Sequence, residues 1–278
     1  MAGDPLHLSA TTDFLRAAGA LPDEMIDIGA TALAFAALDC PDLPLDRYQA
    51  HLRELADTLA ESVTGQSLAD RAAALGEVMA HRFDYQGDAL TYDAQENANL
   101  MRVIDRRKGL PVALGILYLH AGRAQGWTID GLNFPGHFLI RLEAAGQRVV
   151  IDPFHAGRLV DVHDMRDLLK RMGSNREVRP EDYAVAGNRS ILLRLQNNIK
   201  QRALAADDTD RAAAVLRSML LLAPLHAGAW RELGVVGAQA GNLQEAARAT
   251  ERAAELSRDA RERHDALAFL QQLRQRLN

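Results

Sequence analysis

The chain has 278 residues and a formal net charge of -5 at pH 7, with 48% hydrophobic and 25% charged residues. This is the composition of a folded globular protein, and its acidic balance offers no basic field for nucleic acid or anionic lipid. The single cysteine, Cys40, excludes an internal disulfide framework and any metal cluster built from several cysteines. From the acidic charge balance we expect no nucleic-acid partner and no membrane association.

The amino-terminal stretch predicts helices and no export signal. Its first residues lack the basic and apolar segments of a secretion signal, so we expect a cytoplasmic protein. Residues 23–39 start acidic and become apolar, as a buried helix does, and two prolines in residues 39–44 end it. Residues 45–63 repeat apolar side chains at helical spacing, and Ser67 resembles the cap of a further helix. Residues 1–82 are thus predicted to be a helical layer.

The middle of the chain predicts two helices of different character. The first spans about residues 95–107 and ends at Lys108-Gly109. The second begins at Pro111. Proline suits the first turn of a helix, where a backbone N–H group has no partner and its loss costs nothing. This second helix is apolar almost all round, so we expect it to be a central, buried element.

A β-hairpin is predicted directly after these helices. Two strand-like runs, residues 136–142 and 147–153, are separated by a short turn that contains glycine. If the turn is centred between residues 144 and 145, His137 lies directly opposite Asp152. Facing side chains on neighbouring strands are close enough for a hydrogen bond, so we expect these two residues to touch.

From Asn188 onward the sequence is helical again and it repeats. The repeat has the 34-residue spacing of tetratricopeptide units, which begin with a tryptophan, a leucine and a glycine. The matching residues are Trp230, Leu233, Gly234, Gly237, Gly241, Ala246 and Ala253 in one unit, and Ile199, Ala203, Ala212, Leu216 and Pro224 in the unit before it. Small residues such as Gly234 let the two helices of a unit approach closely, and residues 265–278 predict a capping helix.

Residues 96–160 resemble the SirB1 family, which joins a transglutaminase-like core to tetratricopeptide repeats. The resemblance rests on Asn97, Leu100, Val103, the run Arg107-Lys-Gly-Leu-Pro111, the run Asn133-Phe-Pro-Gly-His-Phe-Leu139 and the run Val150-Ile-Asp-Pro-Phe154. It implies an α+β fold in which a helical amino-terminal layer packs round a small antiparallel sheet of the papain-like, transglutaminase-like type. We expect this domain over residues 1–185, and a helical tetratricopeptide domain over residues 186–278.

The same resemblance assigns candidate site residues. It implies that His137 is the catalytic histidine of a transglutaminase-type site and that Asp152 is its acidic partner. The cysteine nucleophile of that superfamily would fall at residues 111–113, which here are proline, valine and alanine. None of these can form a thioester, and Cys40 lies far upstream beside a proline. The further binding candidates are Arg107, Pro111, Asn133 and Arg141.

Three interpretations of the His137–Asp152 pair stay open. The pair stabilises the sheet while the cleft binds a peptide or a partner; or His137 activates water as a general base, oriented by Asp152; or both residues bind a metal together with His155. The helical spacing of zinc peptidase ligands is absent, so we expect neither a metal nor another cofactor. Arg141 and Arg148 share the His137 face in the predicted register and offer a site for an anionic group.

The functional expectation follows from the incomplete site. We expect a non-catalytic or degenerate transglutaminase-like protein that binds a protein or peptide, with the repeats as its interaction surface. The alternative is an amide or ester hydrolase that uses His137 and Asp152 without a cysteine nucleophile. The sequence predicts no particular oligomeric state.

Overall fold

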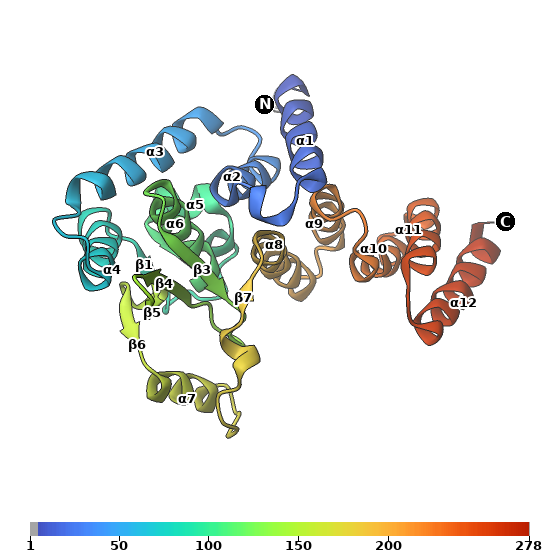
Figure 1. Cartoon of the computed structure of the whole chain (residues 1–278). Helices are drawn as coiled ribbons and strands as arrows, with labels where there is room; N and C mark the ends of the chain where they lie inside the picture. The colour runs from blue at the N-terminus through green and yellow to red at the C-terminus, as the bar shows by residue number, and fades with distance from the viewer. Residues whose placement is uncertain (1–4, 278) are drawn as a thin grey trace. The chain divides into compact units, whose positions relative to one another are not determined.

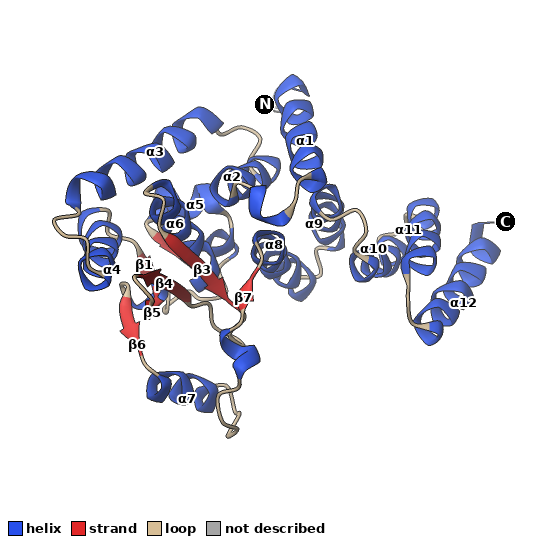
Figure 2. Ribbon diagram, viewed as in Figure 1, coloured by secondary structure: helices blue, strands red, loops and turns tan. Residues whose placement is uncertain are grey.

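The computed structural model describes residues 5–277, which form two compact units. Of these residues, the first unit holds 5–8 and 22–195, and the second holds 9–21 and 196–277. Figure 1 follows the chain through both units, and Figure 2 shows that strands occur only in the first among the described residues. No sequence pattern predicts that residues 9–21 group with the carboxyl-terminal helices. The expected division between residues 185 and 186 stays a prediction.

Helices make up most of the first unit. They are α2 (Ile28–Asp39), α3 (Leu45–Ser62), α4 (Leu68–Gly76), α5 (Leu100–Arg106), α6 (Pro111–Ala124) and α7 (Val162–Arg171). Shorter helical turns are η1 (Asp23–Met25), η2 (Glu77–Arg82), η3 (Gln95–Ala98), η4 (Pro153–His155) and η5 (Pro180–Tyr183). The predicted cap is present, because Ser67 and Asp70 form a reciprocal capping box at α4.

Two predicted helices are interrupted by caps that the apolar pattern does not reveal. The helix expected over residues 23–39 starts only at Ile28, because the Asp27 side chain accepts a hydrogen bond from the Ala30 amide. The helix expected over residues 95–107 is divided into η3 and α5, because the Asn99 side chain accepts from the Arg102 amide. Both caps satisfy amides that would otherwise lack a partner.

A five-stranded antiparallel sheet lies at the centre of the first unit, in the order β6-β5-β4-β3-β7. Its strands are β3 (Thr128–Leu132), β4 (Ile140–Ala144), β5 (Gln147–Asp152), β6 (Arg158–Val160) and β7 (Val185–Ala186). A separate parallel pair joins β1 (Gln86–Gly87) to β2 (Lys108–Gly109). The predicted hairpin is β4–β5, and the remaining strands extend it on both sides.

The sheet is covered on both faces. Helix α6 packs on one face, where a Cβ atom at Gly115 would lie 2.3 Å from the Phe138 ring, so only glycine allows this approach. The expectation of a central buried helix is therefore confirmed. The opposite face packs against α7 (Figure 1). The buried cluster on that side consists of Leu132, Phe134, Leu139, Val160, Met165, Leu168 and Leu169.

The predicted hairpin register is wrong by two residues. Ala144 pairs with Gln147, so the turn consists of Ala145 and Gly146. Both turn residues have positive φ angles, 51° and 77°, as a two-residue turn of the type favoured in hairpins requires. Strand β4 also begins only at Ile140, so His137 lies in the loop before it and not in a strand. Because the shift is an even number of residues, every side chain of the hairpin keeps its predicted face.

The second unit consists of helices packed in series. They are α1 (Pro5–Ala20), most of which belongs here, the end of α8 (Asn188–Ala205), α9 (Thr209–Leu222), α10 (Ala227–Gln239), α11 (Leu243–Leu256) and α12 (Ala260–Leu277). A Cβ atom at Gly234 would lie 2.3 Å from Thr250 Oγ1, so the predicted close approach within a repeat is present between α10 and α11. The predicted capping helix is α12, except for residue 278, which lies outside the described residues.

Helix α8 starts in the first unit, and Asp23, which lies far away in the sequence, caps its first turn. The Asp23 carboxylate accepts hydrogen bonds from the amides of Asn188 at 2.7 Å and Arg189 at 2.8 Å. The Asn188 side chain in turn donates to the carbonyl oxygens of Asp23 and Ile26. No helix among residues 5–277 is both long and apolar enough to cross a membrane.

Candidate functional site

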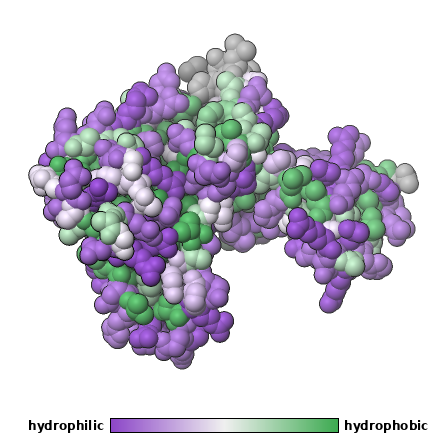
Figure 3. All heavy atoms as spheres, viewed as in Figure 1, coloured by the Kyte–Doolittle hydropathy of each residue, from purple (hydrophilic) through white to green (hydrophobic). Residues whose placement is uncertain are grey.

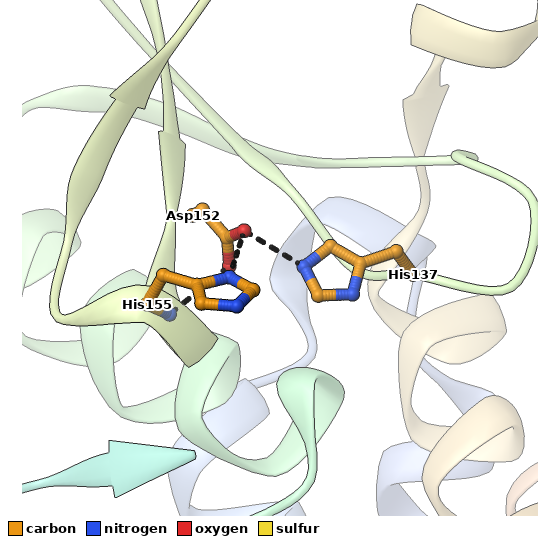
Figure 4. A group of neighbouring side chains, drawn as sticks. All are labelled: His137, Asp152 and His155. Carbon is orange, nitrogen blue, oxygen red and sulfur yellow. Dashed lines mark hydrogen bonds and ion pairs between the residues drawn. The ribbon is translucent and has the colours of Figure 1, made fainter. Parts of the chain in front are cut away.

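Three side chains meet at the end of strand β5. The Asp152 Oδ2 atom lies 2.9 Å from His137 Nε2 and 2.7 Å from His155 Nδ1. Figure 4 shows the carboxylate between the two imidazole rings. The expected contact of His137 with Asp152 is therefore present, and His155 shares the same carboxylate oxygen. We call His137, Asp152 and His155 the His–Asp–His cluster.

The backbone holds each member of the cluster in place. Asp152 ends β5 and caps η4, since its Oδ1 atom accepts the amides of Phe154 at 2.9 Å and His155 at 3.3 Å. Oδ1 is thereby occupied, and Oδ2 is left for the imidazoles. The loop that carries His137 is anchored by Arg194, which donates to the carbonyl oxygen of His137 at 2.7 Å.

The carboxylate of the cluster is ionised. Asp152 is fully buried, and burial alone would raise its pKa. The hydrogen bonds and charges of His137 and then His155 outweigh burial and lower the pKa of Asp152. An ionised carboxylate only accepts hydrogen bonds, so each imidazole donates an N–H to Oδ2. One nitrogen of each ring is left for other chemistry.

Aromatic side chains surround the cluster. The Phe154 ring stands edge-on to His137 and to Tyr92, with centroids 5.9 and 6.0 Å apart. Helix α6 packs against η4 and contributes Tyr118, whose hydroxyl is buried and has no hydrogen-bond partner among the described residues. Burial, and then the charge of Asp152, raise the pKa of Tyr118, which therefore stays protonated. The sequence analysis did not identify Tyr118, because a tyrosine in an apolar helix carries no signal of a site.

Two of the predicted binding residues lie at the start of α6 and just before it. Arg107 has a positive φ of 59° and donates through Nη1 to His51 Nε2 and Tyr85 Oη, both at 2.8 Å. Pro111 is buried in the first turn of α6, as predicted. Among the described residues, neither makes a hydrogen bond or ion pair with the His–Asp–His cluster, and their role as binding residues stays a prediction.

The other two predicted binding residues lie on the sheet. The backbone N–H of Asn133 donates to the backbone carbonyl of Ala184 at 2.9 Å, next to β7. Arg141 is in β4, where its guanidinium lies 2.6 Å from Glu143 and 3.9 Å from Asp130. These acidic neighbours compensate its charge, which weakens Arg141 as a site for an anion. Its binding role likewise stays a prediction.

A groove of about 660 Å³ runs beside β6 and α7. It is lined by Arg141, Arg148, Val149, Val150, Leu159, Val160, Asp161, Val162, Asp164, Met165, Val178 and Tyr183. Apolar surface is visible near these two elements in Figure 3, and the Leu159 and Val162 side chains are more than half exposed. Arg141 and Arg148 thus line one groove together with apolar side chains, and no member of the His–Asp–His cluster lines it, so their predicted place on the face of His137 stays a prediction.

Neither the start of α6 nor Cys40 supplies a thiol to the cluster. Helix α6 begins with Pro111, Val112 and Ala113, which carry no nucleophilic side chain. Cys40 ends α2, and Asn99 Nδ2 of α5 lies 3.6 Å from its sulfur. The Cys40 sulfur therefore lies beside the start of α5, and among the described residues it makes no hydrogen bond to the His–Asp–His cluster.

A second groove, of about 510 Å³, lies within the repeat helices. It is lined by Arg217, Leu220, Leu221, Trp230, Leu233, Asn242, Gln244, Glu245, Arg248 and Ala249, and we call it the repeat groove. Arg217 is paired with Glu245 at 2.5 Å. Arg248 is exposed and forms no ion pair with any described residue. The repeat groove therefore combines apolar walls with one uncompensated positive charge.

Comparisons with known proteins agree with this architecture. Residues 46–197 match the family described as "Transglutaminase-like superfamily", and residues 199–274 match "Tetratricopeptide repeat". A UPF0162 protein of Xylella fastidiosa (strain Temecula1) is 31% identical over 228 residues, which cover 79% of this chain and 80% of that protein. F-box only protein 21 of Homo sapiens is 25% identical over 134 residues, 45% of this chain and 20% of that protein.

Among solved structures, a crystal structure of menin superposes with a TM-score of 0.40 and 9% identity, over 93% of this chain and 73% of that one. The family matches confirm both the expected resemblance and the expected α+β fold with carboxyl-terminal repeats.

Proposed function

Because this chain belongs to the transglutaminase-like superfamily, together with the UPF0162 proteins, we propose that it is a protein-binding module whose transglutaminase-like core lacks thiol catalysis. The proposal on catalysis rests on the start of α6, where proline, valine and alanine stand at the expected nucleophile positions. A cytoplasmic location is part of the same proposal, and fractionation of cells that produce the protein tests it.

The repeat groove is the proposed binding surface. The observation that carries this is the exposed Arg248 guanidinium beside the apolar side chains of Leu220, Trp230 and Leu233. An exposed arginine next to a tryptophan is typical of the residues that contribute most to binding energy at protein interfaces. The matching ligand is a peptide segment with one apolar anchor and one carboxylate, since the groove has one positive charge to neutralise.

Selection from a displayed peptide library tests the proposal with the full chain as bait. We expect the enriched peptides to carry an acidic residue beside an apolar one, and Arg248→Glu to weaken their binding by about 10-fold. Arg258→Glu is the matched control, because Arg258 is exposed, makes the same charge change and does not line the groove. Enrichment of no peptide, or equal binding by both variants, would contradict this function.

A second candidate function is an amide or ester hydrolase. Its support is the orientation of His137 by the ionised Asp152, which leaves a ring nitrogen of His137 to accept a proton from water. A general base alone contributes about 10²–10⁴-fold to a rate. Hydrolysis of a p-nitrophenyl ester that disappears in His137→Ala and persists in His163→Ala would support it. Equal rates in both variants would remove it.

A further inference from the structure

We propose that the His–Asp–His cluster is a binding site for a divalent transition-metal ion such as Zn²⁺. The one ligand atom that each residue offers lies within 4.8 Å of the other two. Two imidazole nitrogens and one carboxylate oxygen are a ligand set that zinc accepts, with the remaining positions open to water or a substrate. This site lies in the first unit, so the proposal is independent of the repeat groove.

The present distances between the ligand atoms can be compared with those in a tetrahedral zinc site. His137 Nε2 and His155 Nδ1 now lie 2.9 and 2.7 Å from Asp152 Oδ2. Ligands of a tetrahedral zinc ion, each about 2.0–2.1 Å from the metal, are about 3.3 Å apart. The two nitrogen–oxygen distances therefore have to open by about half an ångström, while the two imidazole nitrogens, which lie within 4.8 Å of each other, have to come to about the same 3.3 Å. The His155 side chain, which is 46% exposed, has room to make that movement.

Binding of the metal requires proton transfers that the ring chemistry allows. Each imidazole now places an N–H against the carboxylate, and a ligand nitrogen must carry no hydrogen. In each ring the hydrogen moves from the coordinating nitrogen to the other nitrogen, which frees the first one to bind the metal. The Asp152 carboxylate is already ionised, so it needs no proton transfer.

The surroundings of Asp152 resemble those of a built metal ligand. Its Oδ1 atom is held by the amides of Phe154 and His155, which orient Oδ2 toward the two histidines. Ligating carboxylates are commonly fixed in this way by a second set of hydrogen bonds. Oδ1 is thus bonded to backbone amides, and Oδ2 faces the two histidines.

Tyr118 supplies an independent observation. Its side chain is fully buried, its hydroxyl has no hydrogen-bond partner among residues 5–277, and it lies within electrostatic reach of Asp152. A buried hydroxyl without a partner is costly, and such groups in folded proteins commonly mark an unseen water or ion. A water molecule on a metal held by the cluster would provide that partner.

Calorimetric titration of the full chain with ZnCl₂, after treatment with a chelator, tests the site. We expect one ion per chain in the wild type, and an affinity more than about 100-fold weaker in His137→Ala and in His155→Ala, beyond the usual cost of losing an outer hydrogen-bond partner. His163→Ala is the matched control, because His163 is 78% exposed on α7 and should leave the affinity unchanged. Tyr118→Phe should weaken binding by about 10-fold.

The coordination itself can be observed with Co²⁺ in place of zinc. Visible absorption bands of a low-symmetry Co²⁺ site should appear in the wild type and in His163→Ala, and vanish in His155→Ala. Far-ultraviolet circular dichroism confirms that each variant is folded. Absence of zinc binding by the wild type, or wild-type affinity in both histidine variants, overturns the proposal. Peptide binding by the repeat groove is measured separately, so failure of one proposal is distinguishable from failure of the other.

Discussion

In the second unit each repeat helix packs against the next helix along the chain, whereas the first unit brings together residues from distant parts of the sequence. Helices α9 to α12 form an unbroken series of neighbouring contacts. In the first unit, Asp23 caps the helix that begins at Asn188, and Arg194 anchors the loop of His137. The comparison teaches that spacing along the sequence is informative for the repeats and much less so for the cluster.

The two tryptophans of the chain make this comparison measurable. Trp127 precedes β3 in the first unit, and Trp230 lies in α10 of the second. Replacing one of them by phenylalanine leaves a fluorescence signal from a single unit. Urea unfolding of these single-tryptophan proteins then reports the free energy of unfolding for each unit separately.

The largest effect is expected for Asp152→Ala in the first unit. The change removes a buried carboxylate that accepts hydrogen bonds from two amides and two imidazoles. Leaving these donors without an acceptor should cost about 3 kcal/mol in the free energy of unfolding reported by Trp127. Asp152→Asn, which keeps one acceptor oxygen, should lose less. A loss below about 1 kcal/mol for the alanine variant would show that the carboxylate does not organise this end of the sheet.

An intermediate effect is expected for Gly234→Ala in the second unit. The added Cβ atom would lie 2.3 Å from Thr250 Oγ1 and 3.3 Å from the Thr250 backbone nitrogen, so α10 and α11 must separate. We expect a loss of about 2 kcal/mol in the transition reported by Trp230, with the Trp127 transition unchanged. Gly237→Ala is the control, since its Cβ meets Ala246 at an ordinary 3.5 Å. Equal shifts of both transitions would show that the two units unfold as one.

The smallest effect is expected from the titration of His51. Burial first, and then the charge of Arg107, lower the pKa of His51 below its usual value of 6.5. The unfolded chain therefore binds the proton more readily, and the stability of the first unit falls as the pH drops below about 6.5. The contribution of His51 to the loss between about pH 7.5 and pH 5.5 should stay within about 1.4 kcal/mol.

His51→Gln isolates this contribution, because glutamine keeps polar atoms at the site and does not titrate. The variant should show a smaller loss of stability over the same pH range in the Trp127 signal. An identical pH dependence in the wild type and the variant would assign the effect to other groups, of which the half-buried His120 also has a lowered pKa.

Local patterns predicted most of the helices and the repeat. The capping box at Ser67, the proline start of α6 and the glycine approach at Gly234 all depend on residues close in sequence or at a fixed spacing. The short strands β6 and β7 were not predicted, because a strand of two or three residues has too few side chains to show alternation. Their pairing partners are decided by the rest of the sheet.

The sequence predicted which residues form the candidate site, but not which segments of the chain bring them together. An alanine in the left-handed region at position 145 moves the centre of the turn by one residue, so Asp152 is no longer opposite His137 in the register. Alanine carries no signal for that conformation. His137 touches Asp152 from the loop before β4, which begins at Ile140. The sharing of one carboxylate oxygen by His137 and His155 depends on where η4 turns. The burial of the Tyr118 hydroxyl, without a hydrogen-bond partner among the described residues, depends on packing between distant segments and has no signal in the sequence.

The placement of residues 9–21 has a consequence for the order in which the protein is made. Helix α1 leaves the ribosome before α2 to α12, yet its residues from Ser9 onward belong to the unit that contains α9 to α12. At Gly19 this helix lies against the carbonyl oxygens of Leu221 and Leu222, so close that a side chain there would collide. During synthesis the buried side of α1 therefore stays uncovered until α9, which carries Leu221 and Leu222, has also emerged. That interval is when a nascent-chain chaperone has its opportunity to bind.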